Sequence, residues 1–136
     1  MNIAVSVEYG NAPVTILRPE GRLDGGNYRE LIAKAAEVYQ LGARNLLLDL
    51  ADVSFISSAG VVALHTIALL MEGLPLAHIE DGWHSIKRAN MAQPAGVHKH
   101  LKLLNLQPEV QSVLEMLGFT AHLDIYEDKD IALRAF

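Results

Sequence analysis

The strongest constraint on the fold is a nearly unbroken apolar run at residues 46–50, which reads LLLDL. A strand with one face in water alternates apolar and polar side chains, but this run has no polar face. It therefore predicts a strand that is covered on both faces, as in the parallel sheet of an α/β protein. A little further along, Val61–Met71 is apolar almost all round and predicts a well-buried helix.

Two short strands are expected before this unit. Ile3, Val5 and Val7 alternate with small or polar residues, which predicts a half-buried strand. A turn through residues 10–13 leads to a second strand at Val14–Leu17. Two strands joined this closely most simply form an antiparallel hairpin.

Helical spacing follows the hairpin. Five apolar or aromatic residues fall on one stripe of a helix: Tyr28, Leu31, Ile32, Ala35 and Tyr39. We expect Gly42 to end this helix, because glycine readily adopts the left-handed conformation found after helix C-termini.

The C-terminal part predicts two further strand–helix units. Leu101–Leu104 predicts a strand, and Pro108 suits the first residue of a helix that Gly118 would close. The inner stripe expected for this helix is Val110, Val113, Leu114 and Leu117. Leu123–Ile125 predicts a last strand, and residues 127–136 predict a short terminal helix. The order is then ββαβαβαβα, an α/β domain with a mixed sheet.

The connection before Leu101 is unusually long. It has about thirty residues, from Met71 to His100, where roughly two to six are usual. We expect a single domain over residues 1–136, with an atypical insertion at about 73–98 before the fourth strand–helix unit. Glycine and proline argue against regular structure there, while its apolar residues argue against full disorder. These features predict a loosely ordered flap, with Trp83 either anchoring it to the domain or contacting a partner.

Composition excludes several classes of function. The formal net charge is −5, which gives no electrostatic basis for binding nucleic acid or an anionic membrane. The absence of cysteine excludes disulfides, thiol nucleophiles and cysteine metal sites. The apolar segment at residues 59–71 falls short of the roughly 20 residues that a membrane-spanning helix needs, so no membrane insertion is expected. The N-terminal residues do not read as a secretory signal, and a cytoplasmic protein is expected.

Two adjacent serines, Ser57 and Ser58, lie just before the apolar helix. Serine is a favoured N-cap residue, because its oxygen accepts a hydrogen bond from a backbone N–H of the first turn. Capping is therefore expected of Ser57 or Ser58, and a cap does not prevent a neighbouring hydroxyl from being reactive. We therefore consider a second role for one of these two hydroxyls.

Enzymatic uses of these serines are disfavoured. A nucleophile elbow reads G-x-S-x-G, and Ile56 stands where its first glycine belongs. Neither the P-loop nor the dinucleotide-binding pattern of glycines occurs. Asp49 near a strand end could indicate a phospho-accepting receiver domain, but the acidic pair expected after the first strand is missing. The chain is therefore predicted to have no catalytic residues and no cofactor.

Three segments together resemble a known family. LLLDLADVSFISSAGVVAL resembles the signature of the STAS domain, named for sulfate transporters and anti-sigma factor antagonists. GRLDGGNYRELI is similar to the family's G-x-L-D loop, and LNLQPEVQSVLEMLGF to its closing helix. The signature is matched by Asp49, Leu50, Val53, Phe55, Ile56, Ser58 and Gly60. The resemblance implies a single mixed sheet with helices packed largely on one side.

The resemblance also implies a function, that of the bacterial anti-sigma factor antagonists. In these proteins a serine or threonine in the signature loop is phosphorylated by a partner kinase that is also an anti-sigma factor. Ser58 is the matching residue here, and Ser57, which stands in place of an acidic residue, is its rival. The implied partner-binding residues are Asp24, Ser57, Ser58, Ala59 and Gly60. Ser54 and Thr66 are lesser candidates for phosphorylation, with Thr66 expected inside the helix.

Two other functions stay open. One is a non-switching STAS scaffold or transporter-associated subunit, in which Ser58 does not carry phosphate. The other is a small-ligand binder that uses the long insertion as a lid. The sequence does not fix the oligomeric state, and a homo-oligomer is compatible with it.

Histidines gather along the insertion. His78, His84, His98 and His100 could suggest a metal site. Without cysteine or a close third ligand, we expect no metal and interpret these histidines as solvated loop residues.

Overall fold

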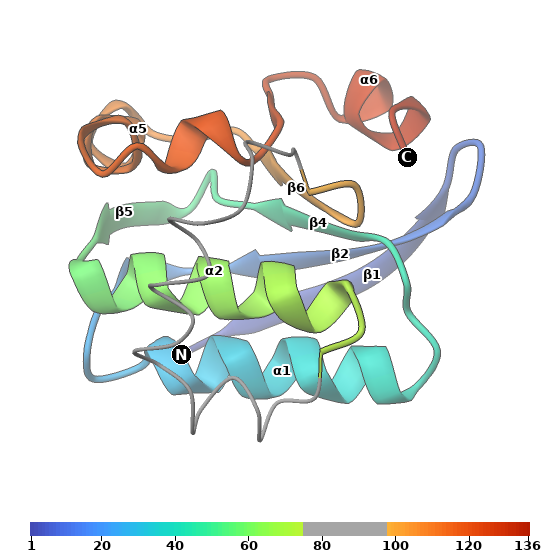
Figure 1. The fold of residues 1–136 in the computed structure, drawn as a ribbon, viewed down its shortest axis with the longest axis horizontal. Coiled ribbons are helices and arrows are strands. Elements are labelled where there is room, and N and C mark those ends of the chain that lie inside the picture. Colours follow the sequence, from blue (N-terminus) through green and yellow to red (C-terminus); the bar gives the residue numbers. More distant parts are fainter. Residues whose placement is uncertain (75–97) are drawn as a thin grey trace.

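The strand β4 (Leu46–Asp49) lies inside the sheet, hydrogen-bonded to parallel neighbours on both sides. The computed structural model, shown in Figure 1, describes residues 1–74 and 98–136. Leu46, Leu47 and Leu48 are completely buried. The prediction of a doubly covered parallel strand is therefore confirmed.

Five strands form the main sheet in the order β1-β2-β4-β6-β7. The other four are β1 (Ile3–Tyr9), β2 (Pro13–Pro19), β6 (Leu101–Leu104) and β7 (Ile125–Tyr126). The first two pair as the predicted antiparallel hairpin, and the remaining pairs are parallel. The predicted α/β class and mixed sheet are confirmed.

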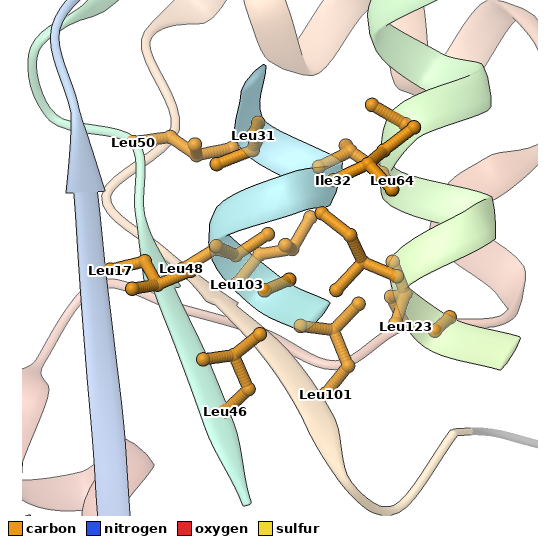
Figure 2. Packing of buried hydrophobic residues seen from close by; sticks show 14 of the residues in the cluster. Leu17, Leu31, Ile32, Leu46, Leu48, Leu50, Leu64, Leu101, Leu103 and Leu123 are labelled. Carbon is orange, nitrogen blue, oxygen red and sulfur yellow. The ribbon is translucent and has the colours of Figure 1, made fainter. Parts of the chain in front are cut away.

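Successive side chains of β4 point to opposite faces of the sheet, and the two faces have separate cores. Leu46 and Leu48 belong to the larger core, whose packing Figure 2 shows, and Leu47 to the smaller one. Among the described residues, three helices contribute to the larger core: α1 (Tyr28–Gln40), α2 (Ser58–Met71) and α5 (Pro108–Met116). The short α6 (Lys129–Arg134) covers the opposite face through Ala132 and Leu133. The helices therefore lie largely on one side, as predicted.

The helix boundaries follow the expected signals. Gly42 has φ of +113° after α1, and Gly118 has φ of +71° after α5, so each adopts the left-handed conformation predicted for a helix end. Pro108 is the first residue of α5. A short 3₁₀ helix, η1 (Phe119–Ala121), follows Gly118.

Two short strands add to the predicted order. β3 (Gly21–Leu23) and β5 (Val53–Ile56) pair in parallel and form a separate two-stranded sheet. They lie between elements that the sequence predicts. The other described strands and α-helices follow one another along the chain in the predicted order ββαβαβαβα. Three and four residues are too few for alternation to show in a sequence.

Three predictions of burial or extent are wrong. In β1 only Ile3 packs against the core, while Val5 and Val7 are 47% and 52% exposed because β1 is the edge strand. Leu117 is 54% exposed because it follows the last residue of α5 and does not continue its inner stripe. The last strand starts at Ile125, and Leu123 is buried in the connection before it.

The insertion lies largely outside the described residues. The predicted flap, the anchoring by Trp83, and His78 and His84 all fall within residues 75–97, as does most of the stretch that the resemblance does not cover. Before it, Gly73 and Leu74 donate backbone hydrogen bonds to Leu70 and Leu69 and finish α2. In the part of the chain that the structure describes, no helix has both the length and the apolarity to cross a membrane.

Candidate functional site

The loops after β3 and β5 lie side by side because the two strands are parallel and end at the same edge. Leu23 pairs with Ile56, and the backbone N–H of Ser57 donates to the carbonyl oxygen of Leu23 at 3.0 Å. The loop that begins at Asp24 is thereby held against the start of α2. The structure brings together the two segments that the sequence singled out.

Ser57 and Ser58 have different surroundings. Ser57 is the N-cap of α2, with extended backbone, and its Oγ accepts a hydrogen bond from the Gly60 N–H at 3.4 Å. Ser58 is the first residue of α2 and is exposed, while Ser57 is half-buried. Of the two serines, Ser57 is therefore the one that caps α2, and Ser58 carries the exposed hydroxyl.

Gly60 allows the start of α2 to approach β3 and β5 closely. A Cβ at this residue would lie 2.5 Å from Cγ1 of Ile56 and 2.7 Å from the carbonyl oxygen of Leu23. No side chain fits there without movement of the helix or of the strand backbone. Gly60 is buried and Ala59 half-buried, so these two residues position the loop and leave Ser58 at its surface.

Asp24 shapes its own loop. Its Oδ1 accepts from the Gly26 N–H at 2.9 Å, and its backbone N–H donates to Oδ1 of Asn27 at 3.0 Å. Its Oδ2 lies 3.8 Å from Nε of Arg22, and the carboxylate stays partly exposed. Asp24 is therefore a turn residue whose charge also faces solvent beside the start of α2.

Arg22 was missed by the sequence analysis. It is the ladder partner of Phe55, and its guanidinium carbon lies 4.2 Å from the centroid of the Phe55 ring. This cation–π contact places a positive charge beside the site. Arg22 and Phe55 occupy paired positions in β3 and β5. The sequence does not reveal this contact, because it does not show that the two short strands pair.

The turn before β5 is fixed by a second group of polar contacts. Arg18 Nε donates to Oδ2 of Asp52 at 2.8 Å, and the Arg18 Nη1 lies 3.8 Å from Oδ2 of the buried Asp49. The hydrogen bond with Asp52 and the charge of Asp49 raise the pKa of Arg18. Gln107 Nε2 donates to the carbonyl oxygen of Ala51 at 2.8 Å. Neither Arg18 nor Gln107 was a sequence candidate.

The remaining candidates for phosphorylation differ in access. Ser54 is exposed in β5, whereas Thr66 is 4% exposed inside α2, as expected. A buried hydroxyl cannot reach a kinase in the folded protein. Thr66 therefore drops out of the candidate set.

The interpretation of His98 as a solvated residue is wrong. His98 is 8% exposed, and its Nδ1 contacts Oε1 of Glu72, because the chain before β6 turns in beside the end of α2. His100 is exposed and lies 3.1 Å from Oδ1 of Asn45. Within residues 1–74 and 98–136, no three His, Asp or Glu side chains are grouped so as to hold a metal ion.

Comparisons with known proteins identify the fold and the family. A sequence model of the STAS domain matches residues 5–72, half of the chain. A candidate anti-sigma factor antagonist of Thermotoga maritima superposes with a TM-score of 0.64 at 18% identity, covering 95% of this chain and 91% of its own. An anti-sigma factor antagonist of Mycobacterium paratuberculosis gives 0.60 at 19%, covering 98% and 93%.

A third solved structure has the same fold. The Bacillus cell fate determinant SpoIIAA in its phosphorylated form superposes with a TM-score of 0.56 at 17% identity, covering 98% of this chain and all of its own. No curated protein sequence matches significantly. The structural likeness extends over nearly the whole chain, and the sequence match includes most of the hairpin, α1, β4, β5 and α2. The chain belongs to the STAS domain family.

Proposed function

We propose that the protein is a regulatory protein-binding module, an anti-sigma factor antagonist-like switch that phosphorylation of Ser58 turns off. The observation that carries the proposal is the exposed hydroxyl of Ser58 at the first residue of α2, beside a neighbouring serine that is used as the cap. One structural neighbour is described as an anti-sigma factor antagonist, and another was solved in a phosphorylated form.

The location of Ser58 suits a switch that leaves the domain folded. A phosphate adds about −1.5 to −2 charges, and the N-terminal end of a helix favours an anion by roughly 0.3–1 kcal/mol. The 14-residue α2 provides that end. The exposed cation of Arg22 lies on the adjacent strand, which further favours an anion in this region.

A partner docked over the same loop would respond differently. Its surface complements the unphosphorylated loop and the partly exposed Asp24 carboxylate, so it is not built to accept two more negative charges. Like charges brought together at an interface cost several kcal/mol. Since each 1.4 kcal/mol or so changes affinity tenfold, phosphorylation is sufficient to release the partner.

The proposed partner is an anti-sigma factor that is also a serine kinase. Such a kinase needs an accessible hydroxyl, which Ser58 provides, and a rigid surface around it, which Gly60 and the β3–β5 pair provide. Binding, without catalysis by this chain, is then the whole activity. Because kinase, ATP and sigma factor meet in the bacterial cytoplasm, the proposal assigns the protein to that compartment.

Mapping the phosphate tests this proposal. The wild-type protein, Ser58→Ala and Ser57→Asn are incubated with ATP and the serine kinase that binds the unphosphorylated protein, and phosphopeptides are identified by mass spectrometry. Asparagine is as good an N-cap as serine but has no hydroxyl, so Ser57→Asn removes the rival acceptor and keeps the cap. Phosphate is expected on the wild type and on Ser57→Asn, and not on Ser58→Ala.

The other outcomes distinguish the alternatives. Phosphate that persists in Ser58→Ala and disappears in Ser57→Asn would move the acceptor to Ser57. No phosphate on any of the three proteins would contradict the switch and favour the non-switching scaffold. A metabolite that copurifies with the protein would favour the ligand-binding alternative.

A further inference from the structure

Three histidines and a glutamate from separate parts of the chain lie near one another, outside the serine loop. His65 lies in the middle of α2, Glu72 follows the end of that helix, His98 precedes β6, and His122 follows η1. The proposed function uses none of them. We refer to these four residues as the histidine cluster.

Direct contacts join His98 to Glu72 and to His122, and His65 to Phe119. The Nδ1 of His98 contacts Oε1 of Glu72, and the backbone N–H of His98 donates to the carbonyl oxygen of His122 at 2.9 Å. The ring of His65 meets that of Phe119 edge to face, with centroids 6.0 Å apart. The cluster therefore joins α2 to η1 and to the segment that leads into β6.

Burial makes the histidine cluster sensitive to an added charge. His65 and His98 are each 8% exposed, so a proton added to His65 would be poorly solvated. The nearby His98 and His122 also oppose a positive charge on His65, and Glu72 favours it. Phe119, whose ring meets that of His65, is apolar.

We propose that the histidine cluster is an acid-sensitive joint, in which protonation of His65 weakens the attachment of α2 to η1 and to the segment before β6. The protein should therefore open or unfold more readily as the pH falls through the range in which free histidine titrates. The residues of the cluster lie outside the serine loop, although His65 shares α2 with Ser58.

The sign follows from the two states of the chain. Burial, then the nearby His98 and His122, lower the pKa of His65 in the folded protein, and Glu72 only partly opposes them. In the unfolded chain the pKa returns to about 6.5. Between the two values the unfolded state binds more protons, so stability is full above pH 6.5 and is lost as the pH falls below it.

Urea denaturation at pH 7.5 and pH 5.5 measures the effect. If folded His65 stays neutral throughout, this residue alone raises the unfolding constant by about tenfold over that interval, which is the upper limit for one histidine. His65→Gln should lose this part of the pH dependence. His100→Gln is the matched control, because His100 is exposed, and it should keep the dependence of the wild type.

A measurement on the wild type, together with a second variant, covers the case in which His65→Gln does not fold. The Cε1 proton of His65, followed by NMR, should titrate below about pH 6.5. In Glu72→Gln its midpoint should fall further, since Glu72 raises the pKa of His65. A His65 midpoint at or above pH 6.5, or equal pH dependence in the wild type and His65→Gln, would overturn the proposal.

Discussion

At the residue scale, Ser57 and Ser58 are adjacent in sequence but unequal in their contributions to stability. Ser57→Ala removes the oxygen that accepts from the Gly60 N–H. We expect a loss of about 0.5–1 kcal/mol, in the lower part of the range for N-caps because the hydrogen bond is long at 3.4 Å. Ser58→Ala removes an exposed hydroxyl and should change stability by less than about 0.5 kcal/mol.

Urea unfolding monitored by circular dichroism measures both variants. Ser57→Asn serves as the control, because it restores a capping oxygen and should unfold like the wild type. A larger loss in Ser58→Ala than in Ser57→Ala would show that the assignment of the cap is wrong.

Gly60 gives a second prediction at this scale. An added Cβ would lie 2.5 Å from Ile56 and 2.7 Å from the backbone of Leu23, so Gly60→Ala should destabilise the domain by about 1–3 kcal/mol through overpacking. Gly25→Ala is the matched control, since a Cβ there has no neighbour within 4 Å among the described residues. Equal midpoints of thermal unfolding for the two variants would contradict the close approach of α2 to β3.

At the scale of elements, α6 is a six-residue helix that depends on its docking surface. Leu133 is buried against the face formed by Val14, Ile16, Leu47 and Leu104. Leu133→Ala should cost about 2 kcal/mol, the lower end of the range for large-to-small core substitutions, since the helix is terminal and can shift. Its neighbour Ile131 is 51% exposed, and Ile131→Ala should cost less than about 0.5 kcal/mol.

Denaturant midpoints for this pair of variants report on the face opposite α1 and α2. If both substitutions cost the same, α6 is not docked through Leu133. A cost confined to Leu133→Ala supports the smaller core as a structural part of the domain.

The elements that the sequence predicts correctly have a strong period or a strong signal at their ends. The apolar stripe of α1, the all-round apolar α2 and the Leu run of β4 each carry one signal through their whole length. β3 and β5 were not predicted, because each is short and becomes a strand only by pairing with the other. The burial of β1 was also overestimated, since alternation does not reveal that a strand lies at the edge of the sheet.

In the candidate site too, the sequence predicts the features that have a local signal and misses those that depend on contacts between distant segments. The resemblance implies that Asp24 and the two serines share one partner-binding surface, and the β3–β5 pair brings them together. The sequence could not tell which serine caps the helix, because both are compatible with that position. It could not reveal the cation of Arg22 over Phe55 or the histidine cluster either, because those contacts join distant segments of the chain.

At the scale of the whole molecule, the ends of the insertion lie close together. The Nδ1 of His98 contacts Oε1 of Glu72, so a short linker can connect Leu74 to His98. Replacing residues 75–97 by a short Gly/Ser linker should leave a domain that unfolds cooperatively, because the described residues form both cores and changes of loop length cost little entropy.

Calorimetry of this deletion variant measures whether one sharp transition remains. A broad transition, or failure to fold, would show that the replaced residues belong to the core. If the variant folds but selects partners differently from the wild type, the insertion modifies binding.

The central claim is that a phosphate on Ser58 changes binding without changing the fold. Isothermal titration calorimetry of the kinase partner against the unphosphorylated and the Ser58-phosphorylated protein tests it most directly. We predict that phosphorylation weakens the affinity at least about tenfold while the melting temperature of the domain stays the same. Equal affinity of the two forms, with phosphate confirmed on Ser58, would contradict the account.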